Sequence, residues 1–169
     1  MSKSKVVTAL YDSKNKAMRA INNLESMGYK SNDISFLVTD NTWKDGKDLK
    51  IESNTKAPEG ATVGGVIGGI AGAVAAGVLA TGAVVSSGAV LAAGPAIAAL
   101  AGAGAGGASG GLLGGLVGMG FNETEAKYVN DQIEAGQVMI GVNARNDSDH
   151  VDTLETYLKG TNPVKVTVH

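Results

Sequence analysis

The side chains that could do acid–base or metal chemistry are few and stand apart from one another. The chain has two histidines and no cysteine. His150 lies beside Asp149 and Asp152, and this setting is typical of a surface helix residue. Neither His150 nor His169 has a partner at metal-ligand spacing. The sequence therefore predicts no metal site and no catalytic residue.

Glycine-rich and acidic segments also lack the spacing of known ligand sites. The run Gly102-Ala103-Gly104 is not followed by the acidic residue of a dinucleotide site, and no phosphate-binding loop motif is present. The acids around Asp45-Gly46 miss the spacing of a calcium loop, so we interpret them as a solvated loop. Trp43 in that loop is interpreted as a packing or interfacial residue. We expect no cofactor, no small-molecule substrate and no enzyme.

The most specific feature of the chain is a long segment without charge, in which glycine recurs every fourth residue. Residues 60–122 contain no Asp, Glu, Lys or Arg, and 20 of the 25 glycines lie in 60–120. On a helix, residues four apart share a face, so each stretch would offer a smooth groove to another helix. The residues expected to pack helices and drive self-association are Gly64, Gly68, Gly72, Gly102, Gly106, Gly110, Gly114 and Gly118.

The two ends of the chain have ordinary periodic patterns. We expect strands over 6–11, 34–39, 138–144 and 164–168, helices over 14–27, 122–135 and 148–160, and a polar linker over 40–58. This order predicts an α+β fold, a ferredoxin-like sandwich with helices on one face of an antiparallel sheet. It would be a discontinuous domain of residues 1–57 and 120–169. A Gly/Ala-rich, hydrophobic helical hairpin over 58–119 would interrupt it.

The hairpin would consist of helices over about 61–85 and 95–119, joined by a bend. Each is long enough to cross a bilayer, but Ala101–Gly111 contains no large apolar residue. A hairpin without a polar face must meet lipid or other copies of itself. Its predicted hydrophobic outer face consists of Val66, Ile70, Val74, Ile97, Leu100, Leu113 and Leu116.

Several motifs resemble those of a bacterial family, the general stress proteins known as heat-induced or low-temperature-induced. They are the opening strand Val6–Asp12, the helix end Met27-Gly28-Tyr29, the strand Asp33–Val38, the bend Val90–Pro95 and the return helix that starts at Gly120–Ala126. The chain has Ser86-Ser87 where the family often has prolines. The resemblance implies a non-enzymatic stress-response protein and supplies no catalytic or binding residues.

Two functions remain open from the sequence. The hairpin could enter the inner membrane from the cytoplasmic side, flanked by Lys44, Lys47, Lys50, Lys56 and Lys127. Alternatively, the protein is a soluble homo-oligomeric scaffold, a ring, shell or filament, with hairpins buried between copies. The N-terminus does not look like a cleaved signal peptide, so a cytoplasmic start is expected. The formal net charge of -2, without a basic patch, gives no sign of nucleic acid binding.

Overall fold

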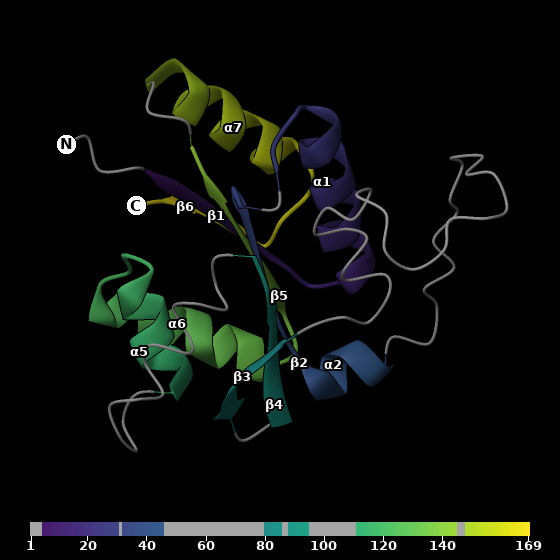
Figure 1. Cartoon of the computed structure of the whole chain (residues 1–169), viewed down its shortest axis with the longest axis vertical. Helices are drawn as coiled ribbons and strands as arrows, with labels where there is room; N and C mark the ends of the chain where they lie inside the picture. The colour runs from purple at the N-terminus through teal and green to yellow at the C-terminus, as the bar shows by residue number, and fades with distance from the viewer. Residues whose placement is uncertain (1–4, 31, 46–79, 86–87, 95–110, 145–147) are drawn as a thin grey trace, which may run out of the picture.

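The fold is mixed, with helices and strands alternating along the chain (Figure 1). The computed structural model describes residues 5–30, 32–45, 80–85, 88–94, 111–144 and 148–169. The elements in chain order are β1 (Val6–Tyr11), α1 (Lys14–Ser26), β2 (Ile34–Thr39), α2 (Asp40–Asp45), β3 (Ala80–Val85), β4 (Gly88–Ala93), α5 (Gly111–Gly118), α6 (Glu123–Glu134), β5 (Val138–Asn143), α7 (Ser148–Gly160) and β6 (Lys165–Val168).

The strands form one antiparallel sheet in the order β3-β4-β2-β5-β1-β6. The late strand β5 lies between the two early strands, and it pairs along its length with β1, from Val6 opposite Asn143 to Tyr11 opposite Val138. Neither end of the chain can therefore complete the sheet without the other. The predicted α+β class is confirmed, and the two ends share one sheet.

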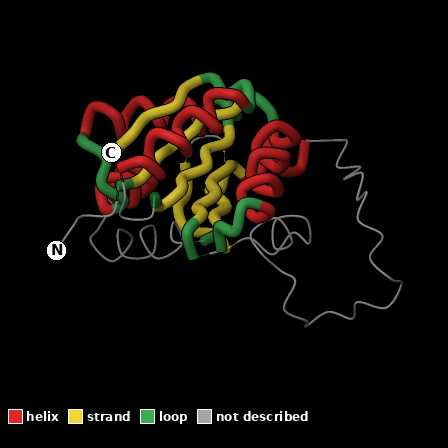
Figure 2. The backbone as a smooth tube through the Cα atoms, turned by 90° about the horizontal axis from the view of Figure 1, so that it is seen from above, coloured by secondary structure: helices red, strands yellow, loops and turns green. Residues whose placement is uncertain are grey.

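Helices cover both faces of this sheet, whereas the sequence led us to expect them on one face (Figure 2). Alternate strand residues such as Val7, Ala9 and Phe36 pack with α1 and α7 in a first core. The residues between them, such as Leu10, Leu37 and Met139, pack with α5 and α6 in a second core. The second layer forms because this face of the sheet is also apolar, and apolar surface left in water would cost free energy.

The helices α1 and α6 both begin after a polar residue in the N-cap position. Asn122 caps α6 through a capping box, in which its side chain accepts from the Glu125 backbone N–H at 2.9 Å. Ser13 occupies the N-cap position of α1 in an extended conformation, but its side chain makes no capping hydrogen bond. The predicted polar linker is wrong at its start, because Asp40–Asp45 form helix α2.

The predicted helix is wrong for residues 80–85, which form strand β3, and the predicted bend contains strand β4 at residues 88–93. β4 pairs with β2, and its residues Val90 and Ala92 are buried in the second core. Glycine weakens a helix interior, while β-branched residues suit a strand that finds a pairing partner, and β2 is that partner. Residues 61–79 and 95–110 of the expected helices lie outside the described residues.

Helix α5 confirms the last part of the second expected helix, over 111–118. Its residues Leu112 and Leu116 are buried in the second core together with α6 and β4. The described part of the segment 58–119 thus shares a core with the rest of the chain. Among the helices that the structure describes, none has the length and apolar character needed to cross a bilayer.

Candidate functional site

The outer face of α5 is the clearest unusual surface among the described residues. This helix carries no charged residue, so both its faces are apolar or small. Leu112, Gly115 and Leu116 face the second core. Leu113 and Val117, one helical turn apart, are 40% and 45% exposed on the opposite side. A short helix that is apolar all round would normally be buried on every side.

Two of the predicted self-association residues, Gly114 and Gly118, lie in α5. Gly118 is exposed, Gly114 is half-buried, and a side chain added at Gly118 would meet open space. Of the predicted outer face, Leu113 is exposed as expected. The predicted placement of Leu116 on the outer face is wrong, because this side chain is completely buried. It packs in the second core against the apolar face of the sheet. The other predicted residues lie outside the described part: Gly64, Gly68, Gly72, Gly102, Gly106, Gly110, Val66, Ile70, Val74, Ile97 and Leu100.

Val117 belongs to this surface, but the sequence reasoning did not name it. Its signal was its position four residues after Leu113, which places the two side chains on one face of a helix. Together Leu113, Gly114, Val117 and Gly118 form a stripe along α5, which we call the α5 stripe. The stripe alternates small and apolar positions, the pattern that lets two helices approach closely.

Strand β3 lies against α5 and forms one edge of the described sheet (Figure 1). Its one described hydrogen-bonding neighbour is β4. The sequence of β3 contains no charged residue and no proline, the devices by which natural proteins protect an edge strand from pairing with another chain. Strand β3 and helix α5 are neighbours, and the α5 stripe lies on the face of α5 opposite the second core.

The side chain of His169 is largely buried, with 6% of its surface exposed. Its Nε2 lies 3.2 Å from Thr8 Oγ1, its Nδ1 lies 3.4 Å from Glu125 Oε2, and its ring centroid lies 4.1 Å from that of Phe121. Burial lowers the pKa of His169 below 6.5, and the neighbouring Glu125 opposes this effect.

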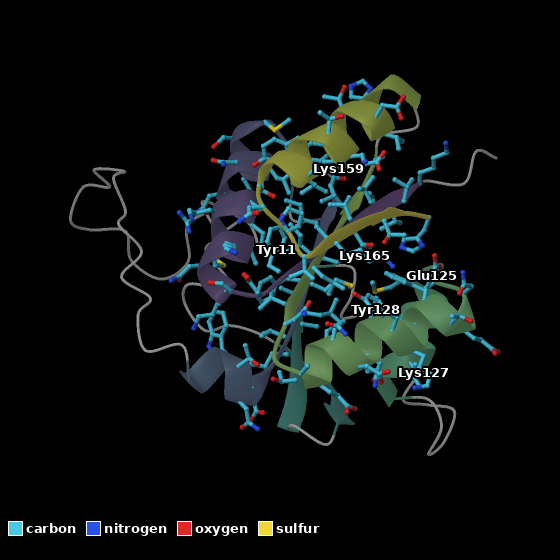
Figure 3. All side chains as sticks on the ribbon, turned by 180° about the vertical axis from the view of Figure 1, so that it is seen from behind. Tyr11, Glu125, Lys127, Tyr128, Lys159 and Lys165 are labelled. Carbon is cyan, nitrogen blue, oxygen red and sulfur yellow. The ribbon has the colours of Figure 1, made fainter. Side chains whose placement is uncertain are left out.

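This histidine and glutamate could in principle form an acid–base pair, but the space beside them is too small for a substrate. The adjoining hollow has a volume of about 10 Å³, about enough for a single water molecule. Lys165 lies next to it, with its Nζ 4.5 Å from the centroid of the Tyr128 ring (Figure 3). We interpret the group as packing between β6 and α6. His150 is exposed, as expected.

Trp43 has the packing role that was one of its two interpretations. Its ring lies edge-on to Phe36, with centroids 6.3 Å apart. The buried Lys14 donates to the Trp43 carbonyl oxygen at 2.8 Å, and its Nζ lies 4.2 Å from the Trp43 ring centroid. Burial lowers the pKa of Lys14, while the ring and the carbonyl replace part of its lost hydration. These contacts hold α2 against α1.

Within the described residues, no group of histidine, cysteine, aspartate or glutamate side chains could hold a metal ion. Comparisons of the chain with protein-family models, with curated proteins and with solved structures found no match. The proposed function therefore depends on the surfaces of the chain itself.

Proposed function

We propose that this protein is a non-enzymatic stress-response protein that acts by associating with copies of itself through its uncharged segment. The motifs quoted above, similar to those of bacterial general stress proteins, support the stress-response part of the proposal. The α5 stripe supports self-association, and it is the observation on which the proposal depends. The association would bury the stripe and the neighbouring β3 edge.

The chemistry of the α5 stripe favours a second copy of the chain as its partner. Leu113 and Val117 supply apolar area, and each Å² removed from water contributes roughly 25 cal/mol. Gly114 and Gly118 supply a groove between them, where a second helix can approach closely. The same stripe on a second copy has the same ridge and groove, so two copies related by a two-fold axis would complement each other.

We further assign the frame of the molecule to the ferredoxin-like class. The strand order β2-β5-β1-β6, with α1 and α7 connecting β1 to β2 and β5 to β6, supports this assignment. In this assignment β3, β4, α5 and α6 are additions to the frame. The ferredoxin-like frame would support the α5 stripe, through which copies of the chain associate.

Membrane association is the second candidate function. It is favoured by the absence of charge throughout residues 60–122, and Lys127 is exposed on α6 as a flanking cation. In this version the α5 stripe would meet lipid at the cytoplasmic face of the inner membrane. The protein would be a peripheral or inserted component there.

A double substitution on the α5 stripe tests the proposal. Leu113→Asp with Val117→Asp should reduce the assembly to smaller species in sedimentation velocity, because charge on the stripe opposes its burial. Met27→Asp is the matched control, since Met27 is also an exposed apolar residue (48%) but lies at the end of α1. Unchanged assembly in the double variant would contradict the proposal.

Lipid vesicles separate the two versions. In a flotation assay with vesicles of phosphatidylglycerol and phosphatidylethanolamine, the scaffold version expects the wild-type protein to stay at the bottom of the gradient. Flotation that the double variant loses and Met27→Asp keeps would instead support the membrane version.

A further inference from the structure

A cleft of about 590 Å³ opens between α1 and the end of α7, away from the α5 stripe. Helix α1 lines it with Lys16, Arg19 and Asn23, which share one helical face. Thr156, Tyr157 and Asn162 line the opposite wall. Pockets for small molecules have volumes of roughly 300–1,000 Å³, so the cleft is large enough for a metabolite.

The lining of the cleft contains two cations and no carboxylate, and one of these cations, Lys16, is ion-paired with Asp12 outside the lining. Lys16 Nζ lies 2.9 Å from Asp12, which holds the ammonium group in place beside the cleft. Arg19 donates from Nε to the Asn15 carbonyl oxygen at 3.4 Å and forms no ion pair within the described residues. Most donors of its guanidinium group are therefore available to a ligand.

A buried hydroxyl group at the wall of the cleft also lacks a partner. The phenol oxygen of Tyr157 is buried and has no hydrogen bond among the described residues. Its neighbour Tyr11 differs, because Tyr11 Oη lies 2.6 Å from Thr161 Oγ1, which itself donates to the Leu158 carbonyl oxygen at 2.6 Å. A buried polar group without a partner costs roughly 1–3 kcal/mol, and such groups are rare in native proteins.

We propose that this cleft binds a small organic phosphate of up to nucleotide size. A phosphate monoester carries a charge of roughly −1.5 to −2 at neutral pH, which suits Arg19 together with the Asp12-paired Lys16 three residues away on the same helix face. The Arg19 guanidinium would bind two phosphate oxygens, and Lys16 would supply the second charge.

The rest of such a ligand would lie along the opposite wall. The amide of Asn162 and the hydroxyl of Thr156 can donate and accept hydrogen bonds, as sugar hydroxyls require. Figure 3 shows Tyr11 beside the ribbon of α1.

Calorimetric titration of the full-length protein with AMP tests the proposal. We expect saturable binding at one site per chain, which Arg19→Gln weakens by about tenfold or more because a charged hydrogen-bonding group is lost. Lys127→Gln is the matched control, since Lys127 is also an exposed helix cation with an i,i+4 contact, to Asp131, but lies on α6. It should bind AMP like the wild type.

A second variant tests the position of the site without a change of charge. Thr156 is exposed, so Thr156→Trp should fill the cleft, leave the melting temperature unchanged and abolish AMP binding. No saturable heat with AMP in the wild type would overturn the proposal, as would wild-type affinity in both Arg19→Gln and Thr156→Trp. Succinate that binds as tightly as AMP would overturn the assignment to phosphate.

Discussion

At the scale of single residues, Tyr11 and Tyr157 carry neighbouring buried phenol groups with different hydrogen bonding. Burial raises the pKa of Tyr11 to about 12, so its hydroxyl stays protonated and donates to Thr161. We expect Tyr11→Phe to lower the free energy of unfolding by about 1 kcal/mol, because a hydrogen bond is lost. Tyr157→Phe should be neutral or stabilising, because its oxygen has no partner among the described residues.

Urea unfolding of the two variants side by side measures this difference. The two substitutions remove the same atom from the same residue type, so each serves as the control of the other. Equal losses of stability in both variants would show that the Tyr157 hydroxyl has a partner in solution.

His169 should make the stability of the protein depend on pH. Its pKa in the folded protein is lowered below 6.5, chiefly by burial, while Glu125 raises it and Lys165 lowers it further. As the pH falls below 6.5, the unfolded chain binds a proton that the folded chain binds less readily. The stability contribution is therefore complete above pH 6.5 and is lost as the pH falls through the folded pKa.

Thermal melts of the wild type and His169→Gln at pH 7.5 and pH 5 isolate this contribution. Between pH 7.5 and pH 5, the melting temperature of the wild type should fall further than that of His169→Gln. The other titrating groups are common to both proteins, so the difference reports on His169. A larger loss in His169→Gln would mean that Glu125 dominates and that the pKa of His169 is raised.

The surroundings of these residues could not be predicted from the sequence. The Thr8 contact of His169 spans 161 positions in the chain. The cleft combines α1 with the end of α7, and neither contributes a recognisable motif. Sequence spacing reveals a site only when its residues lie within one element or one loop. These residues meet through the tertiary fold alone.

At the scale of elements, α5 combines a structural face with an exposed one. Leu116→Ala should destabilise the protein by about 2–5 kcal/mol, because it leaves a cavity in the second core. Leu113→Ala should leave the unfolding free energy of the separated chain almost unchanged and should weaken association instead. The pair thus separates folding from assembly on one helix.

The measurement combines chemical denaturation with light scattering at matched concentrations. A large destabilisation by Leu113→Ala in dilute, dissociated protein would show that this side chain is covered within the chain. The α5 stripe would then not be a surface for a partner.

Elements were predictable where their pattern was local. The capping signal at Asn122 and the alternation over Ile34–Thr39 each correspond to an element in the structure. The strands over 80–85 and 88–93 were missed because their uncharged sequence is equally compatible with the end of a helix and a bend. The pairing of β4 with β2, which lies some fifty residues earlier in the chain, favours strands in this region. A local sequence pattern cannot reveal such a long-range pairing.

At the scale of the whole molecule, the two proposed sites lie beside different cores, on opposite faces of the sheet. The first core supports the cleft between α1 and α7, and the second core supports the α5 stripe. The sheet between them is complete only when both ends of the chain pair. Ligand binding and self-association can therefore be tested independently of each other.

The central claim is that the α5 stripe is buried against copies of the chain. Contiguous apolar patches on monomers rarely exceed a few hundred Å². Sedimentation velocity of the full-length protein at micromolar concentration, in buffer without detergent or lipid, tests the claim most directly. We predict species larger than one chain throughout the concentration series. A single species with the mass of one chain, 16.9 kDa, would contradict the account.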